Sequence, residues 1–403
     1  MQTLPSILLR PGEADRVVAG HPWIYHGSIH HLTQPAADGA LVQVKDHRQR
    51  HLGVGIYNSK SKINVRMLHH ERAELNEAFF EERIRAALAV RRRHMPQATS
   101  FRAVNAESDF LSGLIVDKYE DVLVLQTSAL GMDQRKPLIL AALKKIFTPR
   151  AIMERNEMAS RKFEGLPDSN GVLDGESVGD ITIHLNGLKF DINLIEGHKT
   201  GYYLDQQVNY QAVADLVAKY NKPQVLDCFS FLGGFALHAA RAGAAKVQGI
   251  DQSELAVAGA TRIANANGLG DRCTFEAANV FDWLKAATVV PPHEKLIPRF
   301  DVIVLDPPSF TRNRAAVPDA LRGYKEIHLR ALKLLKPGGT LATFCCSHHV
   351  DAVLFEQVIL DAAFDAHKVL RRVASYTQSP DHPILPCIPE TEYLKGYAFE
   401  VAR

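Results

Sequence analysis

Apolar residues follow three different patterns along the chain, and each pattern predicts a different kind of structure. Over residues 1–72 the apolar runs are short, lie close together and are separated by turn residues, which is typical of a small β-barrel. Residues 73–190 mix helical and strand periodicity, which predicts an α+β unit. From residue 191 to residue 403 strands alternate with helices, and this order favours a doubly wound parallel α/β sheet.

The pattern also predicts the individual elements. Asn186-Gly187 predicts a tight hairpin turn, and residues 161–180, which are rich in Gly, Asp and Ser, are expected to be irregular. The expected strands are 6–9, 41–44, 52–57, 63–68, 114–116, 122–126, 151–155, 181–185, 188–195, 225–226, 247–250, 274–275, 302–305 and 340–344. The expected helices are 75–94, 132–147, 208–220, 235–242, 254–267, 280–284 and 320–335. Ligands of such parallel sheets bind at the carboxyl ends of the strands.

The composition is that of a globular protein with complete hydrophobic cores. The chain has 403 residues, of which 46% are hydrophobic, and this length suffices for two or three domains. No apolar run is long enough to cross a bilayer, and the N-terminal stretch lacks the apolar core of a signal peptide. The five cysteines have no metal-ligand spacing, so we expect a reduced, cytoplasmic location with no membrane partner and no metal. They are Cys228, Cys273, Cys345, Cys346 and Cys387.

Charge is distributed unevenly. Residues 1–100 carry 14 Lys and Arg against 9 Asp and Glu, whereas the remaining residues carry 33 against 36. This excess suits a polyanionic substrate, and it also fits an ordinary solvated surface. Trp23 can stack on bases if it is exposed and belongs to the core if it is buried. Arg91-Arg92-Arg93 ends a helix, where arginines complement the helix dipole or contact phosphates.

Residues 224–235, QVLDCFSFLGGF, predict a strand, a glycine turn and the start of a helix. The glycines let a ligand approach the backbone closely. Asp251 ends the next strand, where an acid binds a ribose diol, so we expect a cofactor that carries adenosine. The turn lacks the G-x-G-x-x-G of nicotinamide and flavin sites, and Asp227 suits a cationic ligand end. Both features favour S-adenosylmethionine (SAM), and a packing turn without a ligand is the alternative.

Two further strand ends carry reactive groups. Residues 306–310, DPPSF, form a stiff turn that holds Asp306 at a strand tip beside a slot for a flat ring, or simply a rigid loop. The next strand ends in Cys345-Cys346, followed by two histidines that are candidate bases or structural residues. A thiolate can add to carbon 6 of a pyrimidine, and alternation along a strand lets only one of the two cysteines face a ligand. Buried cysteines, by contrast, only pack.

Two polar motifs lie outside these strand ends. Residues 197–207, GHKTGYYLDQQ, precede the sheet, and their amides and side chains can close over a cofactor. Near the C-terminus, residues 381–383 and 389–396 are expected to form a hairpin with a packed end, for which no chemistry is required.

With these motifs the chain resembles the bacterial large-subunit ribosomal RNA 5-methylcytosine methyltransferases that carry an N-terminal PUA domain. The resemblance covers nearly the whole chain through the motifs GHPWIY, GHKTGYYLDQQ, VLDCFSFLGGF, GIDQS, DVIVLDPPSF, PGGTLATFCCS and DHPILP…PETEYLKGY. It implies a PUA-like RNA-binding β domain over residues 1–72, a central α+β domain over 73–190 and a class I SAM-dependent methyltransferase domain over 191–403.

The resemblance also implies roles for single residues. Cys346 matches the nucleophile of the family's F-S-C-S motif, and Cys345 stands where the family often has serine. Asp306 matches the acid that orients the cytosine. Asn279 stands where an acid usually meets the adenine amine, which the amide oxygen can also accept. The cofactor contacts expected in all are Thr200, Tyr203, Gln206, Asp227, Ser230, Gly233, Asp251, Ser253, Asn279 and Asp306.

We therefore expect a SAM-dependent enzyme that forms 5-methylcytosine in large-subunit (23S) ribosomal RNA through a covalent Cys346 adduct at carbon 6. Ribosomal RNA is the expected partner, and a homodimer is a possible assembly. Two alternatives stay open. One is methylation of an exocyclic amine, which Ser309 before the aromatic of the turn disfavours. The other is a non-catalytic protein that senses SAM and binds RNA or assists assembly.

Overall fold

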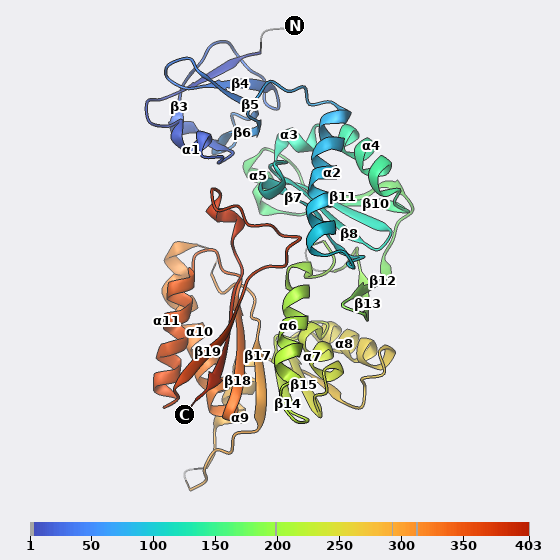
Figure 1. The fold of residues 1–403 in the computed structure, drawn as a ribbon, viewed down its shortest axis with the longest axis vertical. Helices are drawn as coiled ribbons and strands as arrows, with labels where there is room; N and C mark the ends of the chain where they lie inside the picture. The colour runs from blue at the N-terminus through green and yellow to red at the C-terminus, as the bar shows by residue number, and fades with distance from the viewer. Residues whose placement is uncertain (1–3, 198–199, 292, 312, 403) are drawn as a thin grey trace. The chain divides into compact units, whose positions relative to one another are not determined.

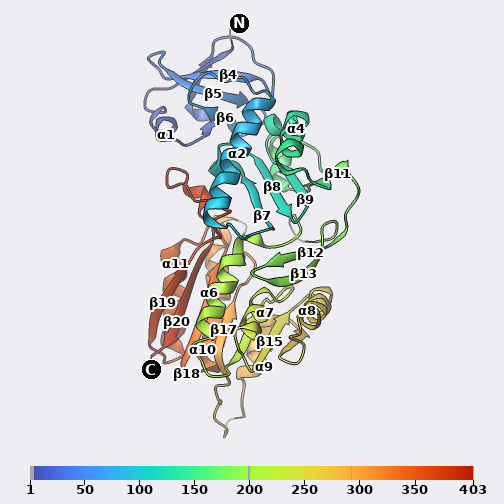
Figure 2. The same cartoon turned by 45° about the vertical axis from the view of Figure 1, so that its right-hand side comes forward.

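The chain forms two compact units and passes between them several times. The computed structural model describes residues 4–197, 200–291, 293–311 and 313–402 (Figures 1 and 2). The first unit consists of Met1–Ile183, Ile192–Leu204 and Pro380–Thr391, and the second of His184–Asp191, Asp205–Ser379 and Glu392–Arg403. Among the helices of the described residues, none combines the length and the hydropathy of a membrane span.

A six-stranded sheet builds the N-terminal part of the first unit, in the order β2-β6-β5-β4-β1-β3. β1 pairs parallel with β4, whereas the other pairs are antiparallel. Val42, Val44 and Val65 are buried in its core. The elements are β1 (Ser6–Leu9), α1 (Asp15–Val18), β2 (Trp23–Tyr25), β3 (Ile29–Leu32), β4 (Leu41–Lys45), β5 (His51–Tyr57) and β6 (Ile63–His69). The sequence pattern misses α1, β2 and β3, because they have three or four residues each and, unlike the fully buried β1, are buried only in part.

A five-stranded sheet, in the order β11-β10-β9-β8-β7, forms the rest of this unit. Helices α2 and α4 pack together over a core that includes Phe80, Ile84 and Leu143 (Figure 1). The strands are β7 (Phe101–Asn105), β8 (Leu114–Tyr119), β9 (Val122–Thr127), β10 (Ala151–Asn156) and β11 (Ser169–Gly175). The helices are α2 (Glu77–His94), α3 (Leu130–Asp133), α4 (Lys136–Phe147) and α5 (Ala159–Phe163).

Two expectations for this part are wrong. The helix expected over 132–147 is interrupted between α3 and α4, and α4 restarts with Pro137 in its first turn, where a missing N–H is tolerated. The segment 161–180, expected to be irregular, contains β11. Among the described strands, β11 lies at the edge of its sheet and pairs with β10, and Gly171 and Gly175 take positive φ values in it. Its sequence therefore lacks the apolar alternation of a half-buried strand.

The hairpin of β12 (Asp180–Leu185) and β13 (Leu188–Asn193) confirms the turn predicted at Asn186-Gly187. The φ values of Asn186 and Gly187 are 50° and 85°, which a two-residue hairpin turn of type I′ requires. The tip of the hairpin, His184–Asp191, belongs to the second unit, where the Asn186 amide donates to the carbonyl oxygen of Gln207 at 2.7 Å.

A seven-stranded sheet forms the second unit, in the order β16-β15-β14-β17-β18-β20-β19. The first five strands are parallel, whereas β20 is antiparallel to both β18 and β19. The sheet is therefore mixed, and not wholly parallel as expected. Its strands are β14 (Gln224–Cys228), β15 (Lys246–Asp251), β16 (Cys273–Ala277), β17 (Phe300–Leu305), β18 (Leu335–Cys345), β19 (Leu370–Tyr376) and β20 (Lys395–Val401).

The helices of the second unit fall into two groups (Figure 1). α6 packs against α7, while α9 and α11 both pack against α10. These helices are α6 (Gln207–Val217), α7 (Gly234–Arg241), α8 (Glu254–Ala266), α9 (Val280–Thr288), α10 (Val317–Leu334) and α11 (Ala352–Asp365). The central strands end level with one another, because Cys228 of β14 pairs with Leu305 of β17, which in turn pairs with Thr343 of β18. Asp306 and Cys346, which follow β17 and β18, therefore come from the same edge of the sheet.

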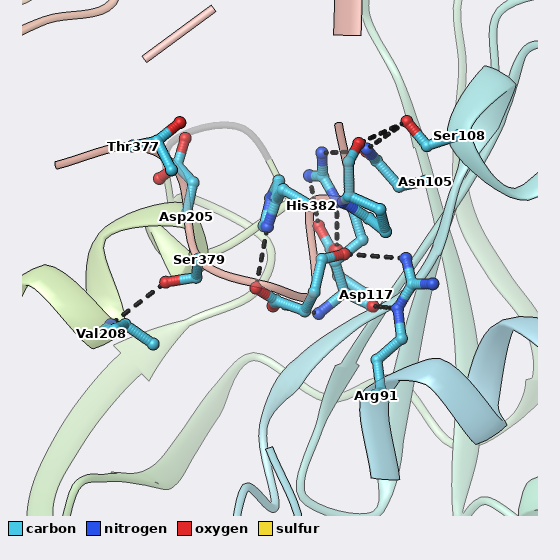
Figure 3. Close-up of polar contacts among 12 residues, drawn as sticks. Arg91, Asn105, Ser108, Asp117, Asp205, Val208, Thr377, Ser379 and His382 are labelled. Carbon is cyan, nitrogen blue, oxygen red and sulfur yellow. Dashed lines mark hydrogen bonds and ion pairs between the residues drawn. The ribbon is translucent and has the colours of Figure 1, made fainter. Parts of the chain in front are cut away.

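The segment Pro380–Thr391 lies between β19 and β20 in the chain but belongs to the first unit, where buried polar contacts hold it (Figure 3). Arg91 donates to both carboxylate oxygens of Asp109, at 2.6 and 2.7 Å, and to the main-chain oxygen of Asp381 at 2.8 Å. The main-chain N–H of Arg102 donates to the Asp381 carboxylate at 2.8 Å. Arg91 thus serves a buried ion pair rather than a phosphate contact, and it lies in the last turn of α2, where its charge complements the helix dipole.

Trp23 serves packing within the first unit. Its indole N–H donates to the Glu107 carboxylate at 3.0 Å, and the Arg66 guanidinium lies over its ring at 5.9 Å from the centroid. His21 meets the same ring edge-on, with 5.4 Å between ring centroids. These contacts favour the core interpretation of Trp23 over base stacking.

Candidate active site

The turn after β14 holds a strained backbone. Phe229, Phe231 and Gly233 have φ values of 64°, 47° and 80°. Bulky residues at positive φ are strained, and such strain gathers at functional sites. Main-chain hydrogen bonds hold the turn, from the N–H of Ser230 to the oxygen of Ile250 at 3.0 Å and from Gly233 to Ser230 at 2.7 Å. The strand–turn–helix corner indicated by the sequence is therefore present, with a fixed backbone.

Asp227 and Ser230 each have a buried side-chain oxygen without a hydrogen-bond partner among the described residues. The second oxygen of Asp227 accepts from the N–H of Ala236, in the first turn of α7, at 2.9 Å. Burial raises the pKa of Asp227 well above its usual value, and the charges of Asp306 and Asp251 raise it further. Because buried polar atoms are normally paired, unpartnered oxygens indicate that a ligand supplies the missing donor. A ligand with a cationic end fits this acidic cluster.

Asp251 holds the same turn from the end of β15. Its carboxylate oxygens accept from the N–H groups of Phe231 and Ser253, both at 2.9 Å. Ser253 in turn caps α8, since its hydroxyl oxygen accepts from the N–H of Ala256 at 3.2 Å. Asp251 is only half-buried, and a carboxylate has about four lone-pair sites, so it retains acceptor capacity for a diol.

Asn279 has a structural role that competes with the expected one. It caps α9, and its amide oxygen accepts from the N–H groups of Phe281 and Asp282 at 2.9 and 3.3 Å. This cap uses the oxygen that was expected to accept from the adenine amine. A contact from this exposed side chain to a base would therefore use the amide N–H as a donor.

Asp306, at the tip of β17, is bonded to Gln206 of the junction motif. The Gln206 amide donates to Oδ1 of Asp306 at 3.1 Å, and its own oxygen accepts from the Asn209 amide at 2.6 Å. Asn209 also donates to the main-chain oxygen of Thr377 at 2.9 Å. Gln206, expected as a cofactor contact, therefore orients the carboxylate of Asp306.

The two adjacent cysteines differ in burial. Cys345 is fully buried at the end of β18, whereas Cys346 follows the strand and is half-buried. The Sγ of Cys346 lies 3.8 Å from the main-chain oxygen of Pro307, the residue after Asp306. The Sγ of Cys345 lies instead 3.3 Å from the hydroxyl oxygen of Tyr324. Only Cys346 of this pair is therefore accessible beside the Asp306 turn.

The loop after β18 is fastened by Lys395 of β20, a residue to which the sequence analysis gave no role. Its ammonium donates to the main-chain oxygens of Ser347 and Val350, at 2.9 and 2.7 Å. Tyr393 donates to the Asp205 carboxylate at 2.7 Å. Both residues belong to the motif PETEYLKGY, and their polar side chains beside an apolar strand were the available signal.

His348 lies on the same loop, with its ring centroid 5.8 Å from that of Tyr393. The side chain is exposed, yet the atoms packed around the ring lower its pKa, and the charges of Lys395 and His349 lower it further. The imidazole is thus neutral at neutral pH and able to accept a proton.

Thr200 and Tyr203, among the expected cofactor contacts, belong to the first unit, whereas the other expected contacts belong to the second. The Thr200 hydroxyl donates to the Asp117 carboxylate at 2.5 Å and lies 2.9 Å from the Tyr119 hydroxyl. Its only proton is therefore used inside the first unit. His198 and Lys199 of the same motif lie outside the described residues.

Two families match the sequence. Residues 7–70 match the PUA-like domain family, and residues 147–389 match the S-adenosylmethionine-dependent methyltransferase family. Over 400 residues the chain is 39% identical to "Ribosomal RNA large subunit methyltransferase I" of Shewanella amazonensis, an alignment that covers 98% of this chain and 99% of that protein.

Solved structures agree in fold. A SAM-dependent methyltransferase from Streptococcus mutans matches with a TM-score of 0.80 at 19% identity, covering 98% of this chain and 100% of that one. The methyltransferase SMU.776, complexed with SAH (the demethylated product of SAM), matches with a TM-score of 0.81 at 20% identity and the same coverage. At such identity these likenesses show the fold alone, an α/β sheet preceded by a PUA-like domain.

Proposed function

The chain belongs to the family of ribosomal RNA large subunit methyltransferase I and depends on SAM, and from this premise we propose that it forms 5-methylcytosine in large-subunit ribosomal RNA. The central step of the proposal is a covalent bond between Cys346 and carbon 6 of the cytosine. One observation carries it: the half-buried Sγ of Cys346 lies 3.8 Å from the oxygen of Pro307, directly after Asp306.

The residues around the β14 turn fit SAM. When bound, SAM supplies an electrophilic methyl group on a sulfonium. Asp227 and Ser230 offer buried oxygens that have no partner in the described part of the chain, and the ammonium of the amino-acid end of SAM can satisfy them. Asp251, at the end of β15, has carboxylate oxygens that can accept from the ribose diol. The negative charge shared by these acids complements the two positive charges of the ligand.

Cys346 acts as the nucleophile. Its thiolate bonds to carbon 6, and the electron pair of the C5–C6 double bond moves to make carbon 5 nucleophilic. Carbon 5 then takes the methyl group as the bond between this methyl and the donor's sulfur breaks, and its electron pair stays on the sulfur, so that SAH leaves. A base removes the carbon-5 proton, and the electron pair left behind re-forms the double bond and expels the Cys346 thiolate. One methyl group has replaced one proton, and the thiolate is regenerated. The neutral imidazole of His348, two residues after the nucleophile, is the candidate base.

Asp306 holds the cytosine ring, because a carboxylate accepts from the exocyclic amine and, when protonated, donates to the ring nitrogen. The hydrogen bond from Gln206 fixes the orientation of this carboxylate. The base must leave its stack to enter the site, as it does for other enzymes that modify bases.

The exposed basic side chains of the β4–β5 region support an RNA partner. Asp46 holds the turn by accepting from Arg50 at 2.6 Å, and the Arg50 side chain is 71% exposed. Arg48 of the same turn is exposed as well. A cluster of this kind neutralises phosphates. The homodimer stays a prediction.

Methylation of an exocyclic amine is less well supported. That chemistry uses an aromatic ring directly after the two prolines, where this chain has Ser309. The next residue, Phe310, packs against Phe281 and Tyr324, with centroids 5.6 and 4.6 Å apart, and so belongs to the core.

The test is methyl transfer from labelled SAM to large-subunit ribosomal RNA and to assembled subunits, with mass spectrometry of the product nucleosides. We expect label in 5-methylcytidine for the wild type and a loss of at least about 10³-fold for Cys346→Ala, with SAH binding retained. Cys387→Ala, at an exposed cysteine of the first unit, is the matched control and should stay active. Full activity of Cys346→Ala, or label on an exocyclic nitrogen, would overturn the proposal. Binding without transfer would indicate the non-catalytic alternative.

RNA that carries 5-fluorocytosine gives a second readout. Fluorine replaces the proton that the base must remove, so the bond to Cys346 cannot be resolved and the protein should stay attached to the RNA. Cys346→Ala should give no such adduct, which peptide mass spectrometry of the digested complex would check.

A further inference from the structure

Hydrogen bonds connect the two residues that flank Cys346. The Sγ of Cys345 lies 3.3 Å from the hydroxyl oxygen of Tyr324, and this oxygen lies 3.1 Å from the Oγ of Ser347. The Oγ of Ser347 lies in turn 2.9 Å from that of Ser309. Cys345, Tyr324 and Ser347 are all fully buried. The contacts thus lead from Cys345, which precedes Cys346, through Tyr324 of α10 to Ser347, which follows Cys346. From Ser347 they continue to the turn that carries Asp306.

Which group donates and which accepts in each hydrogen bond of this series follows from the last acceptor, a main-chain oxygen. Ser309 donates its proton to the main-chain oxygen of Thr311 at 2.9 Å, because a carbonyl oxygen can only accept. Ser347 must then donate to Ser309, and Tyr324 to Ser347. The hydroxyl oxygen of Tyr324 is left to accept from Cys345, which must be a thiol, since a thiolate has no proton to donate.

Tyr324 is held rigidly in its place. Its ring packs between Phe310 and Phe355, with centroids 4.6 and 5.5 Å away. Its main-chain oxygen accepts from Nδ1 of His328 at 2.6 Å. Burial raises the pKa of the Tyr324 hydroxyl, and the neighbouring Cys345 raises it further, so the group remains a donor. A fixed hydroxyl in the core can define the positions of the two residues bonded to it.

We propose that Tyr324 is a positioning residue for the methyl-transfer reaction, and that Cys345 is the hydrogen-bond donor that fixes it rather than a second nucleophile. This inference rests on the proposed role of Cys346. The series ties both chain neighbours of Cys346 to Ser309, three residues after Asp306, and so fixes the thiol relative to the acid. A serine hydroxyl at position 345 can donate in the same way, which accounts for cysteine standing where the resembled family often has serine.

Tyr324→Phe tests the proposal, because it keeps the ring packing and removes only the hydroxyl. A displacement of the nucleophile by a fraction of an ångström to 1 Å lowers turnover by roughly 10- to 100-fold. We therefore expect kcat to fall by about this factor, while KM for SAM and the Kd for SAH stay within about twofold of the wild type. Unchanged kcat, or a parallel loss of SAH affinity, would overturn the positioning role.

Substitutions at position 345 supply the matched pair. Cys345→Ala removes the donor and should lower kcat in the same direction as Tyr324→Phe, whereas Cys345→Ser should restore it to within about threefold of the wild type. Equal activity of the Ala and Ser variants would contradict the donor role. An adduct with 5-fluorocytosine RNA that maps to Cys345 would contradict the assignment of the nucleophile.

The reactivity of the thiol separates positioning from stability. The rate at which iodoacetamide alkylates Cys346 is measured at a series of pH values by peptide mass spectrometry. In Tyr324→Phe this rate, or the pH at which it is half-maximal, should differ from the wild type, while Cys387 reacts as in the wild type. Identical Cys346 profiles would refute the inference. If Cys346→Ala remains active, the proposed function fails; if only Cys346→Ala is inactive and Tyr324→Phe is not impaired, the inference alone fails.

Discussion

Asp117 in the first unit and Asp227 in the second are equally buried, each with 1% of its surface exposed, but their surroundings differ. Asp117 accepts from the Arg102 guanidinium at 2.7 and 2.9 Å and from the Thr200 hydroxyl. Burial alone would raise its pKa, but the charge and hydrogen bonds of Arg102 bring the pKa below the usual value. Asp227 accepts one main-chain bond, keeps an unpartnered oxygen among the described residues and has a raised pKa.

The difference between these two acids separates structure from binding. An acid that the protein pairs with its own arginine is satisfied and has nothing left to offer a ligand. Burying an acid without a cationic partner costs desolvation free energy. Proteins keep such acids at sites where function uses them. Glu164 belongs with Asp117, since Arg66, Ser61 and Asn58 hold its carboxylate at 2.6–3.0 Å. The comparison therefore indicates that Asp117 and Glu164 serve stability, and it supports the proposed role of Asp227 in binding SAM.

The largest expected effect is on stability. Asp117→Asn removes the carboxylate that pairs with the Arg102 guanidinium, whose side chain is only 14% exposed, and this loss costs about 3–5 kcal/mol of unfolding free energy. Asp227→Asn removes a poorly solvated carboxyl group, so the ligand-free protein should unfold at the same urea concentration as the wild type or a higher one. Urea unfolding monitored by circular dichroism, without ligand, compares the two variants. A loss of several kcal/mol in Asp227→Asn would show that this acid is structural too.

Acid should weaken the second unit before the first. Burial lowers the pKa of His238 to about 3 and that of His328 to about 4, from 6.5 for the unfolded chain. Between these values the unfolded state binds more protons, so the contribution of each histidine is full above pH 6.5 and falls as the pH drops, by about 2 kcal/mol at pH 5. The raised pKa of Asp227 acts in the opposite direction, because the folded state then binds this proton more tightly than the unfolded state, so the net loss in the second unit is smaller than the sum of the two histidines. Asp117 and Glu164 have lowered pKa values, so their contribution is lost only as the pH falls below about 4.

Hydrogen exchange read by mass spectrometry, corrected for the intrinsic pH dependence, measures the two units separately. Peptides from the sheet of the second unit should lose protection between pH 6.5 and pH 5, while those of the first unit keep it. The variant His328→Gln should reduce the slope of this loss. Simultaneous loss of protection in both units would contradict the expected difference in acid stability between them.

The affinity for the ligand should depend on pH through Asp227. Because the pKa of Asp227 is raised in the free protein, its carboxyl is protonated over a range of pH where an ordinary aspartate is ionised. An ammonium or sulfonium favours the ionised form, so SAH or SAM must displace a proton there. Affinity should rise by up to about tenfold per pH unit below the raised pKa and level off above it.

Calorimetry of SAH binding in buffers of different ionisation enthalpy would report the released proton directly. In Asp227→Asn the affinity should be lower, by about 100-fold, with no proton release. An unchanged pH dependence in this variant would assign the linkage to another group.

Much of the fold follows from local sequence pattern. Strands such as β1, β6 and β17 lie within one or two residues of their predicted bounds, because their apolar residues alternate or run together. β19 and β20 were not predicted, since β19 is an edge strand with mostly exposed or half-buried residues. The intervening residues join the first unit, so no turn signal marks the two strands as a pair. Tertiary contacts, rather than local preference, place them.

The residues of the candidate site also fall into those that local sequence pattern reveals and those that depend on tertiary contacts. Asp227, Asp251, Asp306 and Cys346 could be found because each directly ends or follows a strand, where parallel sheets present their residues. The role of Lys395 was missed, because its bonds to the loop after β18 join positions 45 and 48 residues apart. The structural uses of Thr200 and Asn279 also escaped the sequence. In the sequence, the Thr200 hydroxyl and the Asn279 amide look like ligand contacts. In the structure, the hydroxyl donates to Asp117 and the amide oxygen caps a helix.

The smallest effect concerns Trp23, which tests whether the basic N-terminal segment, residues 1–100, uses aromatic stacking. In Trp23→Phe the ring remains, while the hydrogen bond to Glu107 is lost, which costs about 1 kcal/mol. If Trp23 is a packing residue, RNA affinity at fixed salt should be unchanged, whereas Arg50→Gln, at an exposed cation, should weaken RNA binding and reduce its salt dependence. Filter binding of ribosomal RNA over a range of salt concentrations measures both. A stacking residue would give the opposite result, because replacing Trp by Phe would lower affinity without changing the slope against salt.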